Sequence, residues 1–140
     1  MNTTADKVFF DTNVLLYMYE TDSRKRLRAK SLFSESAREG RLVLSTQVVQ
    51  EFYVAGSRKL GVPREIMRKS ALHFLKLPIV INGPLEIARA FEIEELYAIS
   101  FWDALILAAA EAGKADVLFT EDLNHGQKYG SVLAVNPFLD

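Results

Sequence analysis

Acidic side chains stand at two places where a buried strand is expected to end. Asp11 directly follows the apolar segment Val8-Phe9-Phe10, and Asp122 comes just after Leu118-Phe119-Thr120. In open parallel sheets, ligands bind outside the carboxyl ends of the strands. Although Asp11 and Asp122 are far apart in the chain, a parallel sheet would therefore place both at the same edge.

A third acid, Asp103, is the single polar residue of the run 101–110, whose other members are aromatic or aliphatic. Apolar residues on every side predict a central, buried helix. A carboxylate buried there must be paired, hydrogen-bonded or metal-bound, because its desolvation is costly. The alternative is a helix cap, with Ser100 at the N-cap and Asp103 three residues later. The two interpretations are compatible.

Glu51 is a weaker candidate for the same cluster. It lies mid-helix, near the border of the apolar face that Val48, Val49 and Phe52 define. Such a glutamate is ordinarily a solvated surface residue. Only the other three acids make it a candidate.

An oxygen-rich set of this kind suits hard cations such as Mg²⁺ and Mn²⁺. One or two such ions can activate water, hold a phosphate and stabilise a leaving oxygen. The chain has no cysteine, which excludes disulfides and thiolate metal sites and fits a reducing cytoplasm. It also lacks the G-x-S-x-G and phosphate-loop motifs. Neither histidine has a partner at zinc spacing: His73 is expected to be structural, and His125 either a substrate contact or a plain loop residue.

Short β-branched runs alternate with longer helical stretches along the chain. Strands are expected at 8–10, 42–44, 78–81, 116–119 and 131–135. Helices are expected at 13–19, 23–39, 46–59, from 63 onwards, at 84–96 and at 101–112. Short, nearly all-apolar strands indicate a parallel sheet covered on both faces. We therefore predict one α/β domain, residues 1–140, built as three α/β/α layers.

The composition suits such a domain. Of 140 residues, 49% are hydrophobic and 25% charged, enough for a real core. The first apolar run is interrupted by Asp11 and Asn13 and follows no basic segment, so neither a signal peptide nor a membrane span is expected. Residues 1–70 carry 13 lysines and arginines against 8 acids, and residues 71–140 carry 4 against 10. This asymmetry predicts a basic surface beside an acidic one.

Four segments resemble the motifs of PIN domains, and among these the VapC-like toxins of bacterial toxin–antitoxin pairs. They are Phe10-Asp11-Thr12-Asn13-Val14-Leu15-Leu16-Tyr17, Val49-Gln50-Glu51-Phe52-Tyr53, Ser100-Phe101-Trp102-Asp103-Ala104-Leu105-Ile106 and Leu118-Phe119-Thr120-Glu121-Asp122-Leu123. The resemblance covers nearly the whole chain in the right order. It implies a parallel sheet between helices and a Mg²⁺ or Mn²⁺ site of acids that hydrolyses RNA, so an endoribonuclease toxin.

The resemblance also assigns roles to the acids. Asp11 and Asp103 would be the principal metal ligands, and Glu51 and Asp122 would complete the cluster, partly through water. Glu121 is a rival for the fourth position. Asp122 is preferred because the fourth acid of the family follows the residue after the threonine.

Other residues would support this site. Asn13, Thr120 and Ser100 would orient the carboxylates, as outer hydrogen-bond partners of metal sites do. RNA also needs positive charge near the acids, and the expected contacts are Arg24, Lys25, Arg26 and Arg28. A second basic group comprises Arg58, Lys59, Arg64, Arg68 and Lys69. The alternative for both groups is a solvated helix face.

The resemblance further implies a homodimer and a small antitoxin protein that covers the groove. Four aromatic residues could serve such an interface or simply the core: Phe33, Phe52, Tyr53 and Phe74. A cytoplasmic location is expected.

Three alternatives stay open. A haloacid-dehalogenase-type phosphatase also begins with an aspartate after a strand, but it needs a second one two residues on, where this chain has Asn13. A receiver-type signalling domain needs adjacent acids after the first strand and a phospho-accepting aspartate mid-chain, whereas residues 45–60 supply only Glu51. The third is a domain of the same fold that binds RNA or a partner without cleavage. Metal-dependent turnover would distinguish it from an enzyme.

Overall fold

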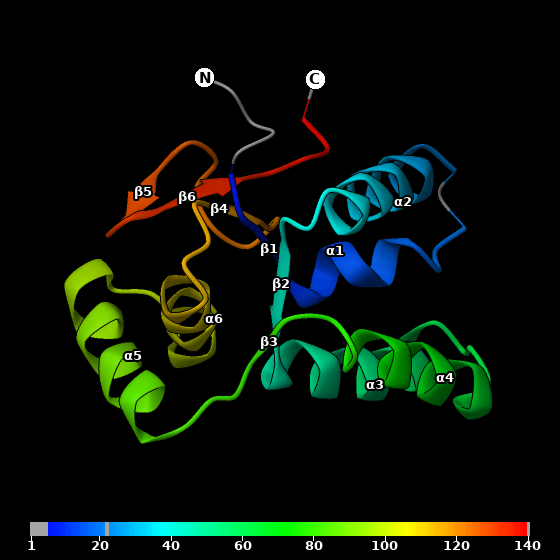
Figure 1. The fold of residues 1–140 in the computed structure, drawn as a ribbon, viewed down its shortest axis with the longest axis horizontal. Coiled ribbons are helices and arrows are strands. Elements are labelled where there is room, and N and C mark those ends of the chain that lie inside the picture. Colours follow the sequence, from blue (N-terminus) through cyan, green and yellow to red (C-terminus); the bar gives the residue numbers. More distant parts are fainter. Residues whose placement is uncertain (1–5, 22, 140) are drawn as a thin grey trace.

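The computed structural model describes residues 6–21 and 23–139. Strands and helices alternate in the expected order (Figure 1). The strands are β1 (Val8–Phe10), β2 (Leu42–Ser45), β3 (Ile79–Val80), β4 (Val117–Phe119), β5 (Lys128–Tyr129) and β6 (Val132–Val135). The helices are α1 (Thr12–Tyr17), α2 (Ser23–Arg38), α3 (Thr46–Lys59), α4 (Arg64–Phe74), α5 (Pro84–Tyr97) and α6 (Phe101–Ala112).

The strands form one sheet in the order β3-β2-β1-β4-β6-β5, and every neighbouring pair is parallel except β5 with β6. In Figure 1, α5 and α6 lie on one side of β1 and β2, and α1 to α4 lie on the other. The predicted α/β class, a mostly parallel sheet between layers of helices, is confirmed. None of the helices within residues 6–21 and 23–139 is long and apolar enough to cross a membrane.

The sheet and the inner faces of the helices share one core. Phe9, Leu44 and Leu118 are completely buried in the central strands. The choice between core and interface for the aromatic residues is settled for Phe52 and Phe74, which are buried with ring centroids 4.9 Å apart. The other two, at positions 33 and 53, are partly buried against the same core.

Side-chain caps set where the helices begin relative to the strands. The Ser45 hydroxyl, at the end of β2, accepts a hydrogen bond from the Val48 amide at 3.4 Å, so α3 starts directly after the strand. The Ser100 hydroxyl accepts from the Asp103 amide at 3.1 Å and starts α6 in the same way. Asp11 is the N-cap of α1. The serine caps at Ser45 and Ser100 were predictable from the sequence, whereas the capping role of Asp11 was not.

Three local predictions were wrong. The strand β5 was not predicted, because a two-residue strand that pairs across a turn at Gly130 gives no hydrophobic period. Pro63 precedes α4 as its N-cap, not as its first helical residue. Asp103 is partly exposed, because α6 is buried from Ala104 to Ala110 while its first turn reaches the surface.

Candidate metal centre

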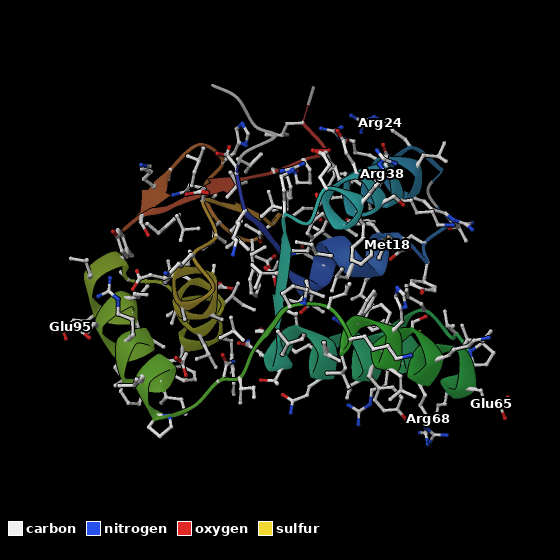
Figure 2. All side chains as sticks on the ribbon, in the orientation of Figure 1. Met18, Arg24, Arg38, Glu65, Arg68 and Glu95 are labelled. Carbon is white, nitrogen blue, oxygen red and sulfur yellow. The ribbon has the colours of Figure 1, made fainter. Side chains whose placement is uncertain are left out.

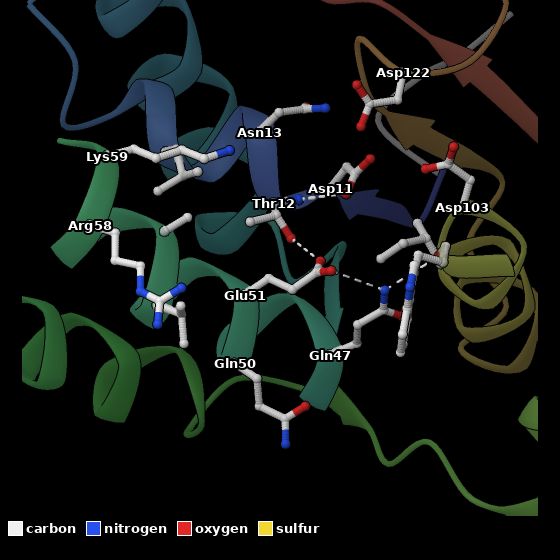
Figure 3. Close-up of a pocket in the computed structure, with 15 residues that line it drawn as sticks. Asp11, Thr12, Asn13, Gln47, Gln50, Glu51, Arg58, Lys59, Asp103 and Asp122 are labelled. Carbon is white, nitrogen blue, oxygen red and sulfur yellow. Dashed lines mark hydrogen bonds between the residues drawn. The ribbon is translucent and has the colours of Figure 1, made fainter. Parts of the chain in front are cut away.

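Three aspartates meet beyond the carboxyl ends of two paired strands. Strand β1 pairs with β4 in parallel, with Phe10 opposite Phe119, so the residues after both strands emerge at the same edge. Asp11, Asp103 and Asp122 each offer one carboxylate oxygen, and these three oxygens lie within 4.8 Å of one another. Figure 3 shows the three side chains turned towards a common space.

Asp11 is the buried member of this cluster, with 5% of its surface exposed. Its Oδ1 accepts a hydrogen bond from the Thr12 amide at 2.7 Å, and its Oδ2 accepts one from the Thr120 hydroxyl at 2.8 Å. Burial raises the pKa of Asp11 to about 7 and outweighs the two hydrogen bonds, which lower it. The negative charges of Asp122 and Asp103 raise it further.

Thr120 connects two of the acids. While its hydroxyl donates to Asp11, its Oγ1 accepts a hydrogen bond from the Asp122 amide at 3.0 Å. The loop after β4 is thereby held against the first strand. The structure places Thr120 next to the carboxylates, where the resemblance had assigned it an orienting role.

Asp103 contributes to the helix cap and to the cluster at once. The cap uses its backbone amide, which donates to Ser100, while one carboxylate oxygen lies among those of Asp11 and Asp122. Burial raises the pKa of Asp103 and outweighs a side-chain hydrogen bond with Ser100, which lowers it. The negative charges of Asp122 and Glu51 raise this pKa further.

Glu51 lies in the same pocket but outside the group of three. Its Oε1 accepts a hydrogen bond from the Thr12 hydroxyl at 2.8 Å, and its Oε2 accepts one from Gln47 Nε2 at 3.4 Å. Sequence reasoning missed both partners. Gln47 stands four residues before Glu51 on α3, a helical spacing that could have indicated it, whereas the Thr12 contact is long-range.

Glu121 points away from the acids. Its carboxylate accepts a hydrogen bond from the Tyr17 hydroxyl at 2.8 Å and forms an ion pair with Lys25 at 2.8 Å. Asp122, the next residue, turns towards Asp11. This arrangement favours Asp122 over Glu121 as the fourth acid.

A cavity of about 720 Å³ opens around the acids. The acids line one part of it together with Asn13, whose side-chain amide has no hydrogen-bond partner among the described residues. The α3 residues Arg58 and Lys59 line another part (Figure 3). The sequence had placed both in its second basic group.

The first basic run lies elsewhere. Within the described part of the chain, the cavity is lined by none of the expected RNA contacts: Arg24, Lys25, Arg26 and Arg28. Arg24 donates a hydrogen bond to the Phe138 carbonyl at 2.8 Å, and Arg28 donates one to the Pro137 carbonyl at 3.0 Å. His125 does not line the cavity either, and its Nδ1 accepts a hydrogen bond from the Asn136 amide at 3.0 Å. The charge of a helix is visible in a sequence, but the side to which it turns is not.

Comparison with known proteins identifies the class of this chain. Residues 8–130 match the model of the PIN domain, and the chain belongs to that family. This assignment removes the phosphatase and receiver alternatives. The comparison with curated proteins gives no match.

Solved structures of toxins share the fold. A toxin–antitoxin complex from Klebsiella pneumoniae contains a chain with a TM-score of 0.71 and 21% identity, covering 94% of this chain and 98% of its own. VapC20 of Mycobacterium tuberculosis, a toxin that cleaves the Sarcin-Ricin loop, has a TM-score of 0.68 and 16% identity, and the match covers 83% of this chain and 90% of VapC20. A chain of the DNA-bound VapBC of Salmonella typhimurium has a TM-score of 0.64 and 16% identity, and the match covers 91% of this chain and 96% of that chain.

The raised pKa of Asp11 predicts how stability depends on pH in the absence of metal. The folded protein holds this proton up to a pH of about 7, and the unfolded chain releases it near the ordinary value of 3.8. The contribution of Asp11 to stability is therefore full below pH 4 and lost as the pH rises through 7. We expect urea unfolding in EDTA to show wild type losing stability relative to Asp11→Asn across this range. A constant difference between the two proteins would contradict the burial of a strained carboxylate.

Repulsion among the acids predicts the behaviour of Asp103→Asn. The asparagine keeps the shape and the amide cap but removes one negative charge, so in EDTA the variant should be as stable as wild type or more so, by about 1 kcal/mol. Excess Mg²⁺ should raise the melting temperature of wild type by mass action and that of the variant little.

Glu95→Gln is the matched control, because this side chain points to solvent from α5 (Figure 2). It should respond to Mg²⁺ as wild type does. If Asp103 only capped the helix, the Asp103→Asn protein would melt lower in EDTA and would still gain stability from Mg²⁺.

Proposed function

We propose that this protein is a metal-dependent endoribonuclease that acts as the toxin of a toxin–antitoxin pair. The observation that carries the proposal is the convergence of Asp11, Asp103 and Asp122 at the strand ends of a PIN-family chain. These acids stand at the positions of the family motifs, in the family order. Glu51 lines the same pocket, where it would complete the four-acid pattern.

The residues present fit Mg²⁺ or Mn²⁺. All donors are oxygen atoms, as hard cations prefer. Asp11 is buried without a cationic partner among the described residues, and a divalent ion would favour its charged form. Asp11, Asp103 and Asp122 would hold the ion, with Glu51 reaching it through water. When bound, such an ion supplies activated water at neutral pH and neutralises charge on the phosphate.

The chain itself supplies position and charge. Thr120 fixes the position of Asp11 relative to the loop that carries Asp122. The Thr12 hydroxyl orients the carboxylate of Glu51 by a hydrogen bond. Arg58 and Lys59 are exposed at the cavity and would attract the sugar–phosphate backbone of RNA. Carboxylates held in position, with basic side chains beside them, are the arrangement that hydrolysis of a phosphodiester needs.

The partners follow from the same assignment. The solved relatives include a toxin–antitoxin complex and a VapBC assembly. We infer that this chain, too, has a small antitoxin protein as its partner, acts on cellular RNA in the cytoplasm and pairs with a second copy of itself.

Cleavage of single-stranded RNA tests the proposal. Mg²⁺ or Mn²⁺ should support cleavage, EDTA should stop it, and Asp11→Asn or Asp122→Asn should lower the rate by roughly 100-fold or more. Because water, not the 2′-hydroxyl, is the nucleophile, the products should carry 5′-phosphate and 3′-hydroxyl ends.

Glu121→Gln is the control for Asp122→Asn, because it changes the neighbouring acid, which faces Lys25 instead of the cluster. It should keep the wild-type rate within a few-fold. Products ending in 2′,3′-cyclic phosphate, or undiminished cleavage in EDTA, would refute the mechanism.

A further inference from the structure

Trp102, the single tryptophan of the chain, is 61% exposed. It immediately precedes Asp103 and lines the same cavity as the three aspartates. Its ring is supported edge-on by Phe101, with the centroids 5.1 Å apart, and Phe101 packs in turn against Phe91 at 5.6 Å. A large ring held in place by aromatic neighbours, yet left mostly uncovered, offers a stacking surface beside the acids.

Gln47 supplies a polar group at the same wall of the cavity. It is 5% exposed, and its Nε2 donates to the Trp102 carbonyl at 3.3 Å and to Glu51. Its Oε1 is buried and has no hydrogen-bond partner among the described residues. A buried acceptor without a partner destabilises the folded state, and a donor from a bound ligand would satisfy it.

The rest of the cavity also suits a nucleotide. Leu16, Val54 and Ile106 give it apolar walls, which a phosphate alone would not need. Arg58 and Lys59 come from the far part of α3, on the opposite side of Glu51 from Asp103 (Figure 3). Neither forms an ion pair within the described residues, so both are free to bind a phosphate.

We propose that Trp102 and Gln47 form a subsite for one unpaired nucleobase of the RNA. The base stacks on the indole of Trp102, an N–H of its edge donates to Gln47 Oε1, and a backbone phosphate further along the strand lies at Arg58 and Lys59. Because Trp102 and Asp103 are adjacent, the stacked base belongs to a nucleotide next to the scissile bond.

This inference rests on the proposed function and narrows its substrate. A base inside a duplex has no free face for the indole, whereas bases in loops and single strands can be splayed out and stacked on aromatic side chains. The substrate class is therefore RNA with an unstacked nucleotide beside the cleaved bond.

Fluorescence of the single tryptophan tests the subsite directly. In EDTA the RNA stays intact, so binding is measured without cleavage. Saturation with a short single-stranded RNA should quench the emission of Trp102, and the same sequence in a duplex should quench it much less. The signal comes from the proposed contact itself, since no other tryptophan contributes.

Affinity for labelled RNA, measured by anisotropy in EDTA, gives the second readout. Trp102→Ala should weaken binding by about 10-fold, and Trp102→Phe, which keeps a stacking ring, by much less. Leu96→Ala is the matched control, because Leu96 is a 68% exposed apolar side chain on α5 that does not line the cavity. It should bind as wild type does. Circular dichroism melts verify that each variant is folded.

An abasic nucleotide beside the cleaved bond completes the test in Mg²⁺. It should slow cleavage by wild type by about 10-fold, but it should slow Trp102→Ala no further, because the stacking contact is already missing.

Two results together would overturn the base subsite: unchanged emission of Trp102 on RNA binding, and wild-type affinity of Trp102→Ala for RNA. If wild type still cleaved RNA, the proposed function would stand. Failure of wild type to cleave any RNA in Mg²⁺ or Mn²⁺ would instead count against the proposed function. If the emission of Trp102 followed protein concentration, and Trp102→Ala turned a dimer into a monomer with normal RNA affinity, Trp102 would belong to a protein interface and the subsite would be refuted.

Discussion

The buried carboxylate of Asp11 is the group on which the surrounding arrangement depends. Burial of its charged form costs free energy that hydrogen bonds, a cation or protonation of the group can offset. In the described structure, the hydrogen bonds come from the Thr12 amide and the Thr120 hydroxyl, and no lysine or arginine pairs with Asp11. Two more carboxylates lie close by and add repulsion. A divalent cation would offset the cost of desolvation and neutralise the repulsion, which gives this fold a physical reason to bind one.

The topology of the sheet brings these acids together. From β1 the chain passes to β2 and β3 on one side, while β4 and β6 lie on the other, so the strand order reverses between β1 and β4. Crevices at such switch points, outside the carboxyl ends of the strands, are where open α/β sheets bind ligands. Asp11 and Asp122 flank this point, and the N-terminus of α6 delivers Asp103 from a different segment. Three distant parts of the sequence therefore share one site without any long loop.

Local chemistry made much of the fold predictable. Ser45 and Ser100 mark helix starts by their capping hydroxyls, and Gly40 marks the end of α2 with a φ of +69°. The strand-end positions of Asp11 and Asp122 follow from the parallel-sheet rule. These predictions succeeded because each depends on a few neighbouring residues or on a rule that holds for the whole class.

Long-range contacts made the rest unpredictable. The hydrogen bond from Thr12 to Glu51 spans 39 residues, and no local pattern indicates it. The basic residues Arg24 and Arg28 donate to carbonyls of the C-terminal segment, a direction that only tertiary packing decides. The exposure of Trp102 is of the same kind: the apolar run around it predicts burial, but the first turn of α6 projects into the cavity.

The central claim is that the three aspartates form one divalent-cation site. Anomalous diffraction from crystals grown with Mn²⁺ tests it most directly, because the signal locates the ion without assuming its ligands. The account predicts a peak among Asp11, Asp103 and Asp122, with carboxylate oxygens of these residues at roughly 2–2.5 Å, and no such peak in crystals of Asp11→Asn. A Mn²⁺ peak elsewhere, with none among the three aspartates in the wild-type protein, would contradict it.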